Sequence, residues 1–239
     1  MPRIWIGTSG YNYPEWKGSF YPEKMKPADM LAFYGQQFDA VEINYTFYRM
    51  PNAKTIDGWA AATPEDFRFV LKAPKRITHE KRLKDFGDSL AVFVRLSSGL
   101  EGRLGPLLFQ LPPNLKKDLP RLEAFLDEIP DTARAAWEFR HESWFDEDVL
   151  AALRARGAAL CVADSEKIST PVVQTASFSY FRLRDEGYQD ADIAAWTERV
   201  REASKSGEVY VFFKHEESGK GPAFAKQMKA LLAAPALQA

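Results

Sequence analysis

Short apolar runs recur along the chain, with starts that lie 20 to 38 residues apart. Each run has the length of a β-strand, is rich in β-branched or aromatic residues, and is bounded by Gly, Pro, Asp or Ser. Most runs carry apolar side chains at both odd and even positions, which is typical of strands covered on both faces in a parallel sheet. The pattern predicts eight buried strands, which begin near Ile4, Ala40, Phe67, Gly105, Arg134, Ala158, Phe178 and Glu208.

Helical periodicity fills most of the intervals between these strands. Apolar residues three and four positions apart predict helices over residues 86–97, 120–129, 145–157, 193–203 and 222–231. The segment 145–157 also has acidic residues at its start, arginines near its end and Gly157 as a stop signal. Residues 165–177 show β-branched residues with little helical period, so we expect a short or irregular connection there.

The alternation of strands and helices, at about 30 residues per unit, favours a (β/α)8 TIM barrel. The alternative is an open doubly wound sheet, which normally carries a glycine-rich phosphate-binding turn after its first strand. Residues 7–13, GTSGYNY, lack the G-x-G-x-x-G spacing of that turn, so the barrel is favoured. We expect residues 1–239 to form a single TIM-barrel domain.

Composition and charge narrow the class of protein. The chain has 46% hydrophobic and 27% charged residues, which excludes a disordered or fibrous chain. Its net charge of -1 excludes a protein that coats nucleic acid through general basicity, but leaves a local basic site open. The single cysteine, Cys161, excludes an internal disulfide and a thiolate metal cluster. The chain starts without a secretory leader pattern and has no apolar run of 18 residues, so we expect a soluble, cytoplasmic protein without membrane association.

Charged residues gather at the predicted strand ends, which converge on one mouth in a barrel. Period-two alternation places three pairs on common faces: Glu42 with Asn44, Glu138 with Arg140, and Arg182 with Arg184. A carboxylate within a strand is costly unless it is paired or functional, so Glu42 indicates either a buried ion pair across the barrel or a functional group. The converging bases are Lys72, Arg76, Arg140, Arg182 and Lys214, against the acids Glu42, Glu138 and Asp164. This excess of bases indicates an anionic ligand, because the guanidinium fork matches phosphate and carboxylate.

The remaining rim residues allow two interpretations each. The basic run over residues 72–84 is either a solvated face or an anion clamp. The aromatic residues of the loop 11–21 either stack on a ligand or form a satellite cluster that caps the barrel. His79, His141 and His215 each follow a predicted strand, and Gln110 ends another. Metal-binding spacings such as H-x-H or H-E-x-x-H are absent from the sequence, so we expect no bound metal and no cofactor.

Six blocks of the sequence resemble the YecE-like family, a domain of unknown function numbered 72. The blocks are IGTSGYNYPEWKGSFYP (6–22), VEINYTFYRMP (41–51), FVLKAPKRITHEKRL (69–83), GPLLFQLPP (105–113), RHESW (140–144) and ADS (163–165). The resemblance implies a TIM barrel of uncharacterised function, similar to endonuclease IV-type and sugar-isomerase barrels at the level of the fold.

The resemblance also points to a set of rim positions and to two departures. The positions are Thr8, Ser9, Gly10, Tyr11, Glu42, Asn44, Phe47, Tyr48, Lys72, Arg76, His79, Gln110, Glu138, Arg140, His141, Trp144, Asp164 and Ser165. Family members tend to carry His-Gly after the seventh strand and Asn-Asn or Asn-Asp after the eighth. Residues 182–188 and 212–221 do not carry these pairs, so two ligand-facing positions differ here.

These observations favour an enzyme that acts on an anionic substrate, such as a phosphorylated compound, a nucleotide or a nucleic acid. We expect Glu42, Lys72, Glu138 and Asp164 to be catalytic, with a glutamate as general base and Lys72 as electrostatic stabiliser or acid. The residues expected to bind substrate are Tyr11, Asn44, Tyr48, Arg76, His79, Gln110, Arg140, His141, Trp144, Arg182 and Lys214. The alternative is a non-catalytic module that binds nucleic acid or a small anion in the same mouth. The sequence does not predict an oligomeric state.

Overall fold

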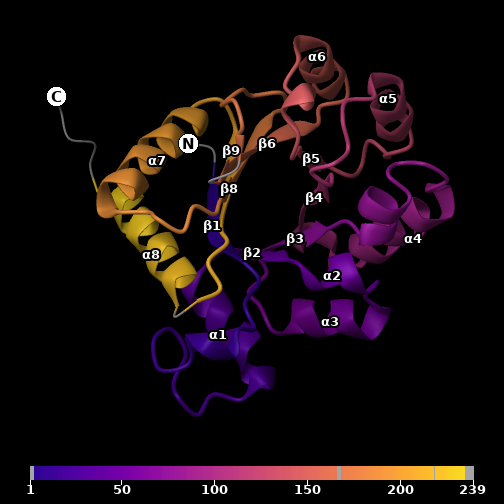
Figure 1. Ribbon diagram of the computed structural model, residues 1–239. Helices are drawn as coiled ribbons and strands as arrows, with labels where there is room; N and C mark the ends of the chain where they lie inside the picture. The colour runs from indigo at the N-terminus through magenta and orange to yellow at the C-terminus, as the bar shows by residue number, and fades with distance from the viewer. Residues whose placement is uncertain (1–2, 166–167, 218, 235–239) are drawn as a thin grey trace.

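The barrel predicted from the sequence is present in a computed structural model, which describes residues 3–165, 168–217 and 219–234. Within these residues, eight parallel strands pair in a nearly closed ring (Figure 1). They are β1 (Ile4–Ser9), β2 (Ala40–Ile43), β3 (Arg68–Lys72), β4 (Leu104–Gln110), β5 (Ala135–Glu138), β6 (Ala159–Ser165), β8 (Phe178–Leu183) and β9 (Glu208–Phe213). The pairing of β9 with β1 joins the two ends of the chain, so the ring depends on contacts between its first and last strands.

Helices cover the outside of the ring, as Figure 1 shows. They are α1 (Met30–Gln37), α2 (Tyr45–Tyr48), α3 (Ala53–Ala61), α4 (Gly87–Ser97), α5 (Leu119–Asp127), α6 (Glu147–Ala155), α7 (Asp190–Ala203) and α8 (Lys220–Ala233). No helix in the described ranges is long and apolar enough to cross a membrane.

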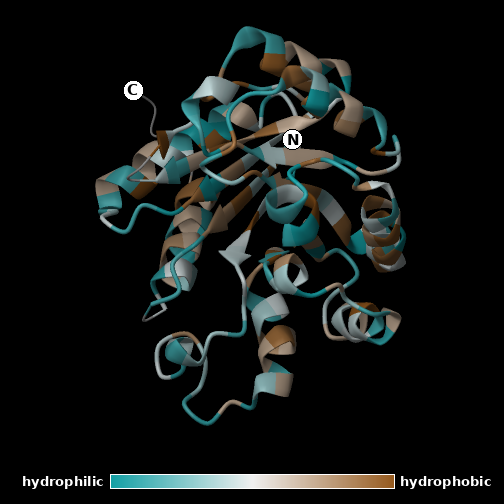
Figure 2. Cartoon of the chain, turned by 45° about the vertical axis from the view of Figure 1, so that its right-hand side comes forward, coloured by the Kyte–Doolittle hydropathy of each residue, from teal (hydrophilic) through white to brown (hydrophobic). Residues whose placement is uncertain are grey.

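Strand parity divides the apolar residues into two cores. Trp5, Val70 and Tyr210 point into the barrel, where they form one buried cluster. Their strand neighbours, such as Ile6 and Leu71, point outward into a larger cluster beneath the helices. In Figure 2 hydrophobic (brown) residues occur on the strands and in bands on the helices, and the outer turns are largely hydrophilic (teal). A strand with apolar residues at both odd and even positions therefore packs against the barrel interior with one face and against the helices with the other.

The segment between β6 and β8 is irregular, as its sequence predicts. It holds the two-residue strand β7 (Ile168–Ser169), which pairs antiparallel with β6, and no helix in its described part; residues 166–167 lie outside the described residues. Threonine hydroxyls hold this segment against the backbone in and just before β6. Thr175 Oγ1 accepts from Leu160 N at 2.8 Å and donates to Ala158 O at 2.7 Å. The irregular segment therefore satisfies buried backbone groups of the neighbouring strand through a side chain.

The N-terminal end of the barrel is closed by cations stacked on aromatic rings. The guanidinium groups of Arg3 and Arg68 lie 4.0 and 4.5 Å from the ring centre of Trp5. Arg134 pairs with Glu208 at 2.6 Å on the same side of the barrel. Since packed side chains fill this end and the lumen above it, chemistry is left to the opposite mouth.

We predict that Gly7→Ala destabilises the barrel and that Gly58→Ala does not. A Cβ at Gly7 would lie 1.8 Å from the carbonyl oxygen of Ala40, so β1 and β2 would have to separate; overpacking of this kind costs about 1–3 kcal/mol. Gly58 is exposed in α3 with open space around it, where alanine raises helix stability by about 0.5–1 kcal/mol. Urea unfolding of both variants measures the difference. Equal stability of the two variants would contradict this account of the β1–β2 contact.

Candidate active site at the mouth of the barrel

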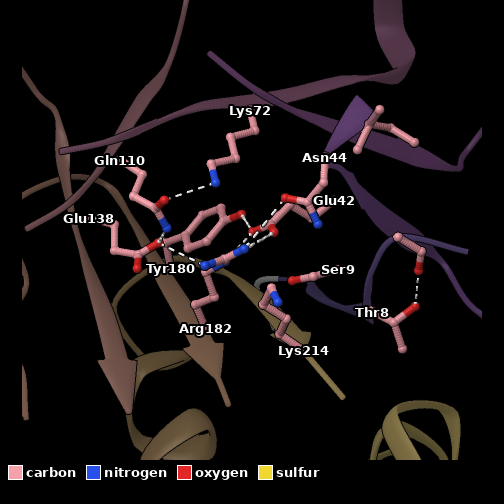
Figure 3. Close-up of polar contacts among 12 residues, drawn as sticks. Thr8, Ser9, Glu42, Asn44, Lys72, Gln110, Glu138, Tyr180, Arg182 and Lys214 are labelled. Atoms are coloured by element: carbon pink, nitrogen blue, oxygen red, sulfur yellow. Dashed lines mark hydrogen bonds and ion pairs between the residues drawn. The ribbon is translucent and has the colours of Figure 1, made fainter. Parts of the chain in front are cut away.

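Six polar side chains occupy the last inward-facing positions of their strands. They are Ser9, Glu42, Lys72, Gln110, Glu138 and Arg182. The ladder places Ser9 beside Glu42 and Gln110 beside Glu138. Below them the inward positions are apolar, so the polar layer begins where the packed lumen ends. Figure 3 shows these side chains converging from different strands on one centre.

Arg182 is the centre of this layer. Its guanidinium is fully buried and bonds two buried carboxylates from strands on other sides of the barrel. Arg182 Nη2 donates to Glu42 Oε1 at 2.9 Å, and Nη1 donates to Glu138 Oε2 at 3.0 Å. Tyr180, two residues earlier on β8, donates its hydroxyl to Glu42 Oε2 at 2.6 Å. The result is a buried ion triad with added hydrogen bonds, which is the condition for burying such charges.

The triad keeps both carboxylates ionised. Burial by itself raises the pKa of Glu42, but the charge and hydrogen bonds of Arg182 outweigh it, and the net pKa is lowered. The pKa of Glu138 is lowered strongly for the same reason, with Arg140 and Lys72 adding to the effect of Arg182. A carboxylate whose pKa is held so far below neutrality is a weak proton acceptor, so these two residues are better suited to an electrostatic role than to proton transfer.

A chain of hydrogen bonds leads from Glu138 to Lys72. Gln110 uses both ends of its amide: Nε2 donates to Glu138 Oε2 at 2.7 Å, and Oε1 accepts from Lys72 Nζ at 2.9 Å. Burial, followed by the charge of Arg182, lowers the pKa of Lys72 to about 7. Lys72 is therefore the group of this layer that changes its protonation near neutral pH. Gln110 is buried. Its position at a strand end suggested contact with a ligand, but its amide instead bridges Lys72 and Glu138.

A cavity of about 530 Å³ lies above one side of the layer. Its wall is formed by Pro113, Glu138, Arg140, His141, Glu142, Ala163, Ser165, Ile168, Arg184 and Glu186. Arg140 Nε donates to Glu138 Oε1 at 3.0 Å, which connects the cavity to the triad. Arg184 lies in the same wall, and burial, followed by the charge of Arg140, lowers its pKa. Two guanidinium groups therefore face one cavity.

The structure brings several of the predicted residues together. Glu42, Lys72, Gln110, Glu138, Arg140 and Arg182 belong to one hydrogen-bonded network. Asn44 Oδ1 lies 3.5 Å from Arg182 Nη2, at the edge of that network. His141 lines the cavity, and Lys214 Nζ pairs with Glu216 Oε1 at 3.0 Å beyond the end of β9.

Asp164 lies elsewhere, and its expected place in the mouth is wrong. Its carboxylate accepts from the hydroxyl of Tyr188 at 2.6 Å and from Nε1 of Trp196 at 3.1 Å, on the side of α7. The parity of β6 explains this, because Ala163 and Ser165 line the cavity and Asp164 between them points outward.

Three further residues were expected to bind substrate, but their positions do not fit that role. Trp144 is fully buried, stacks on Phe139 with ring centres 4.9 Å apart, and donates Nε1 to the carbonyl of Leu115, so it is a core residue. Arg182 is committed to the triad and is fully buried, so it does not reach a ligand directly. Tyr48 is 74% exposed, outside the polar layer.

Tyr11, Arg76 and His79 lie at the margin of the site. Tyr11 packs beside Tyr34 at a ring distance of 6.2 Å, and Arg76 is exposed. His79 packs edge-on against Phe47 at 4.9 Å, and burial, followed by the charge of Lys72, lowers its pKa to about 4.

The other aromatic residues of the first loop form the satellite cluster. Trp16, Phe20 and Tyr21 are buried, and Phe20 packs on Phe33 and Phe38 of the α1 region at 5.6 Å.

Sequence reasoning placed Arg184 on the face of Arg182 without naming it as a site residue, had Ser165 only as a rim position implied by the family resemblance, and missed Tyr180 as a partner of Glu42. Parity was the available signal: Tyr180 and Arg184 share the face of Arg182, and Ser165 shares the face of Ala163. In the described part of the chain, no group of three or more His, Cys, Asp or Glu residues has the geometry of a metal site.

Comparison with known proteins gives one family. The family profile described as "Protein of unknown function DUF72" matches residues 5–239. The chain is 31% identical to a DUF72 family protein of Thermotoga maritima, whose crystal structure superposes with a TM-score of 0.87 over 96% of this chain and 99% of that one. A DUF72 family protein of Enterococcus faecalis gives a TM-score of 0.80 at 22% identity, over 98% and 99% of the two chains.

Two curated relatives carry the names of uncharacterised proteins. The UPF0759 protein YecE of Escherichia coli is 29% identical over 171 residues, which cover 69% of this chain and 60% of YecE. The chain therefore matches less than two thirds of the length of that relative. The UPF0759 protein YunF of Bacillus subtilis is 26% identical, over 96% of this chain and 94% of YunF.

We predict that Arg182→Met destabilises the protein by about 3–5 kcal/mol, because it removes the cation paired with buried Glu42 and one of the two cations paired with buried Glu138. Arg184→Met, two residues along the same face, removes a half-buried guanidinium outside the triad and should cost less than about 1 kcal/mol. Urea unfolding at pH 7 measures both variants. Equal losses would show that the triad does not stabilise the barrel.

A further test compares how the stability of the unsubstituted protein and of Arg182→Met depends on pH. In the unsubstituted protein the lowered carboxylate pKa values give stability that is present above about pH 4.5 and is lost as the pH falls through the folded-state values. In Arg182→Met the buried Glu42 has lost its cation, so burial raises its pKa and the folded state binds a proton at a higher pH than the unfolded state. The stability difference between the two proteins should therefore shrink as the pH falls from 7 to 5.

Proposed function

The chain belongs to the DUF72 family of proteins of unknown function, and from that premise we propose that it is an enzyme that acts on a small anionic substrate in the mouth of its TIM barrel. The observation that supports this most directly is the pair of guanidinium groups, Arg140 and Arg184, in the wall of one cavity. A phosphate or carboxylate between them would relieve their repulsion and accept forked hydrogen bonds from both.

The chemistry of the two arginines fits an anion-binding role. Arg140 is held through Nε by Glu138, which leaves its two Nη groups for a ligand. Among the described residues, the side chain of Arg184 makes no hydrogen bond and no ion pair. His141 adds a ring nitrogen to the same wall, since its Nδ1 is taken by Ser143 Oγ at 2.9 Å. Three nitrogen-bearing side chains therefore surround one volume of a size that suits a metabolite.

The neighbouring polar layer supplies groups for a reaction. Glu138 lines the cavity as a fixed negative charge, and Lys72 changes its protonation near pH 7 two hydrogen bonds away. Lys72 is therefore better suited to proton transfer than the two glutamates, whose carboxylates stay ionised. A site with an anion holder, a fixed charge and a group that titrates near neutral pH has the parts of an enzyme active site.

We expect Arg140→Ala and Arg184→Ala each to weaken the binding of a phosphorylated ligand by about 1.5–3 kcal/mol, the range for hydrogen bonds to charged groups. Calorimetric titration with inorganic phosphate and with phosphorylated sugars measures the loss. Arg95→Ala, at an exposed position of α4, serves as the matched control and should bind like the unsubstituted protein. Equal losses in all three variants would show that the cavity is not the anion site.

Turnover separates the enzyme from a non-catalytic binding module. We expect a phosphorylated compound that binds through Arg140 and Arg184 to be converted, and conversion to be lost in Lys72→Met with binding retained. Binding without conversion of any bound compound would assign the cavity to a sensor or carrier.

The salt dependence of the affinity for a nucleic acid tests whether this mouth binds nucleic acid through few or many phosphates. Duplex binding through Z phosphates gives a log–log salt slope near -0.9Z, and the few free cations of this mouth correspond to a Z of roughly 1–3. A short duplex oligonucleotide titrated at several salt concentrations should therefore show a shallow slope. A steep slope would indicate an extended nucleic-acid surface elsewhere on the protein.

A further inference from the structure

Lys72 is held in an unusual way for a lysine. It ends β3, and its Nζ lies 4.0 Å from the centre of the Phe47 ring, with Gln110 Oε1 as its hydrogen-bond acceptor at 2.9 Å. No carboxylate oxygen of the described residues lies within the 4.0 Å that defines an ion pair with this nitrogen. A buried ammonium with one neutral acceptor and an aromatic face is poorly compensated, which favours the neutral amine.

The charges around Lys72 come from four other strands and loops, and they largely offset one another. Burial has the largest effect on its pKa and lowers it, and Arg182 and then Arg140 act in the same direction. Glu138 and Glu42 raise the pKa, but each of them is already paired with Arg182. With a pKa of about 7, roughly half of the molecules carry a free amine at neutral pH.

We propose that Lys72 Nζ is a nucleophile that forms an imine with the carbonyl carbon of an anionic aldehyde or ketone. The proposal rests on the function proposed above and names its substrate class. It is carried by the position of the amine: at the end of a barrel strand, buried on an aromatic ring and joined by hydrogen bonds to the wall of the cavity.

The step balances without a further reactant. The lone pair of the neutral amine forms a C–N bond with the carbonyl carbon, and the π electrons of the C=O bond move to oxygen. The oxygen takes up a proton, which gives a carbinolamine. Loss of the second N–H proton and of the hydroxyl releases one water and leaves the C=N bond. Both protons of the departing water thus come from the amine nitrogen, and its oxygen comes from the carbonyl.

The hydrogen-bonded chain sets the length that the substrate must have. Lys72 is not one of the residues that line the cavity: Gln110 and Glu138 lie between its amine and Arg140 in that chain. A substrate whose anionic group is held by Arg140 and Arg184 must therefore extend past these two side chains to bring its carbonyl carbon to Lys72. Lys72 is 8% exposed, so only a small part of its side chain is open to a ligand.

Formaldehyde, the smallest carbonyl compound, tests the amine directly. The protein is treated at pH 7 with formaldehyde and cyanoborohydride, which reduces an imine to a methylamine, and each lysine is followed by peptide mass spectrometry. We expect Lys72 to be modified about tenfold faster than the exposed Lys75, with a rate that is half-maximal near pH 7. Modification of Lys72 no faster than that of Lys75 would overturn the proposal. Lys75→Met serves as the control and should leave the reaction of Lys72 unchanged.

Succinic semialdehyde, whose aldehyde and carboxylate are separated by two methylene groups, tests the link to the anion site. Trapping with cyanoborohydride should place a 3-carboxypropyl group on Lys72, and Arg184→Ala should lower the yield about tenfold while formaldehyde still reacts. A yield unchanged in Arg184→Ala would refute the anion site and leave the reactive amine standing. Phosphate binding that depends on Arg140 and Arg184, without preferential trapping at Lys72, would refute the imine and leave the proposed function standing.

Discussion

The buried contact of Arg182 with Glu42 and Glu138 is the interaction on which the upper half of the barrel depends. These residues come from β8, β2 and β5, so one guanidinium joins strands that lie apart around the ring. Each member would be costly to bury alone, and the triad is acceptable because the hydroxyl of Tyr180 and the amide of Gln110 complete its hydrogen bonds. A fully buried ion triad thus holds the strands together at the mouth of the barrel.

The same contact sets the electrostatics of the site. Arg182 is the charge that most lowers the pKa of both carboxylates. Arg184 and Lys72 lie in partly buried positions where burial disfavours their charged forms, with Arg140 adding to the effect at Arg184 and Arg182 at Lys72, and both have lowered pKa values. The guanidinium that stabilises the mouth therefore also helps to keep the neighbouring amine partly neutral.

The irregular segment after β6 also shapes the mouth. A regular barrel would place a helix between β6 and β8, but here the chain turns back as β7 and brings Ile168 into the cavity wall beside Ser165. Thr170 and Thr175 hold the segment through hydrogen bonds to the backbone of β6. The unit with the weakest helical pattern therefore contributes directly to the candidate site, together with the loops after β4, β5 and β8.

The sequence by itself determined the strand spacing, the barrel class and the inward parity of Glu42, Glu138 and Arg182, because alternation along a strand is a local property of the chain. It left open whether the carboxylate of Glu42 was paired or functional, and it mistook the direction of Asp164, since a change from apolar to polar at a strand end does not reveal the face. Only the tertiary structure decided that Arg182 serves the triad, that Trp144 is core and that Arg184 reaches the cavity. Those outcomes depend on strands far apart in sequence meeting around a closed ring, and no local pattern encodes which inward side chains then face one another.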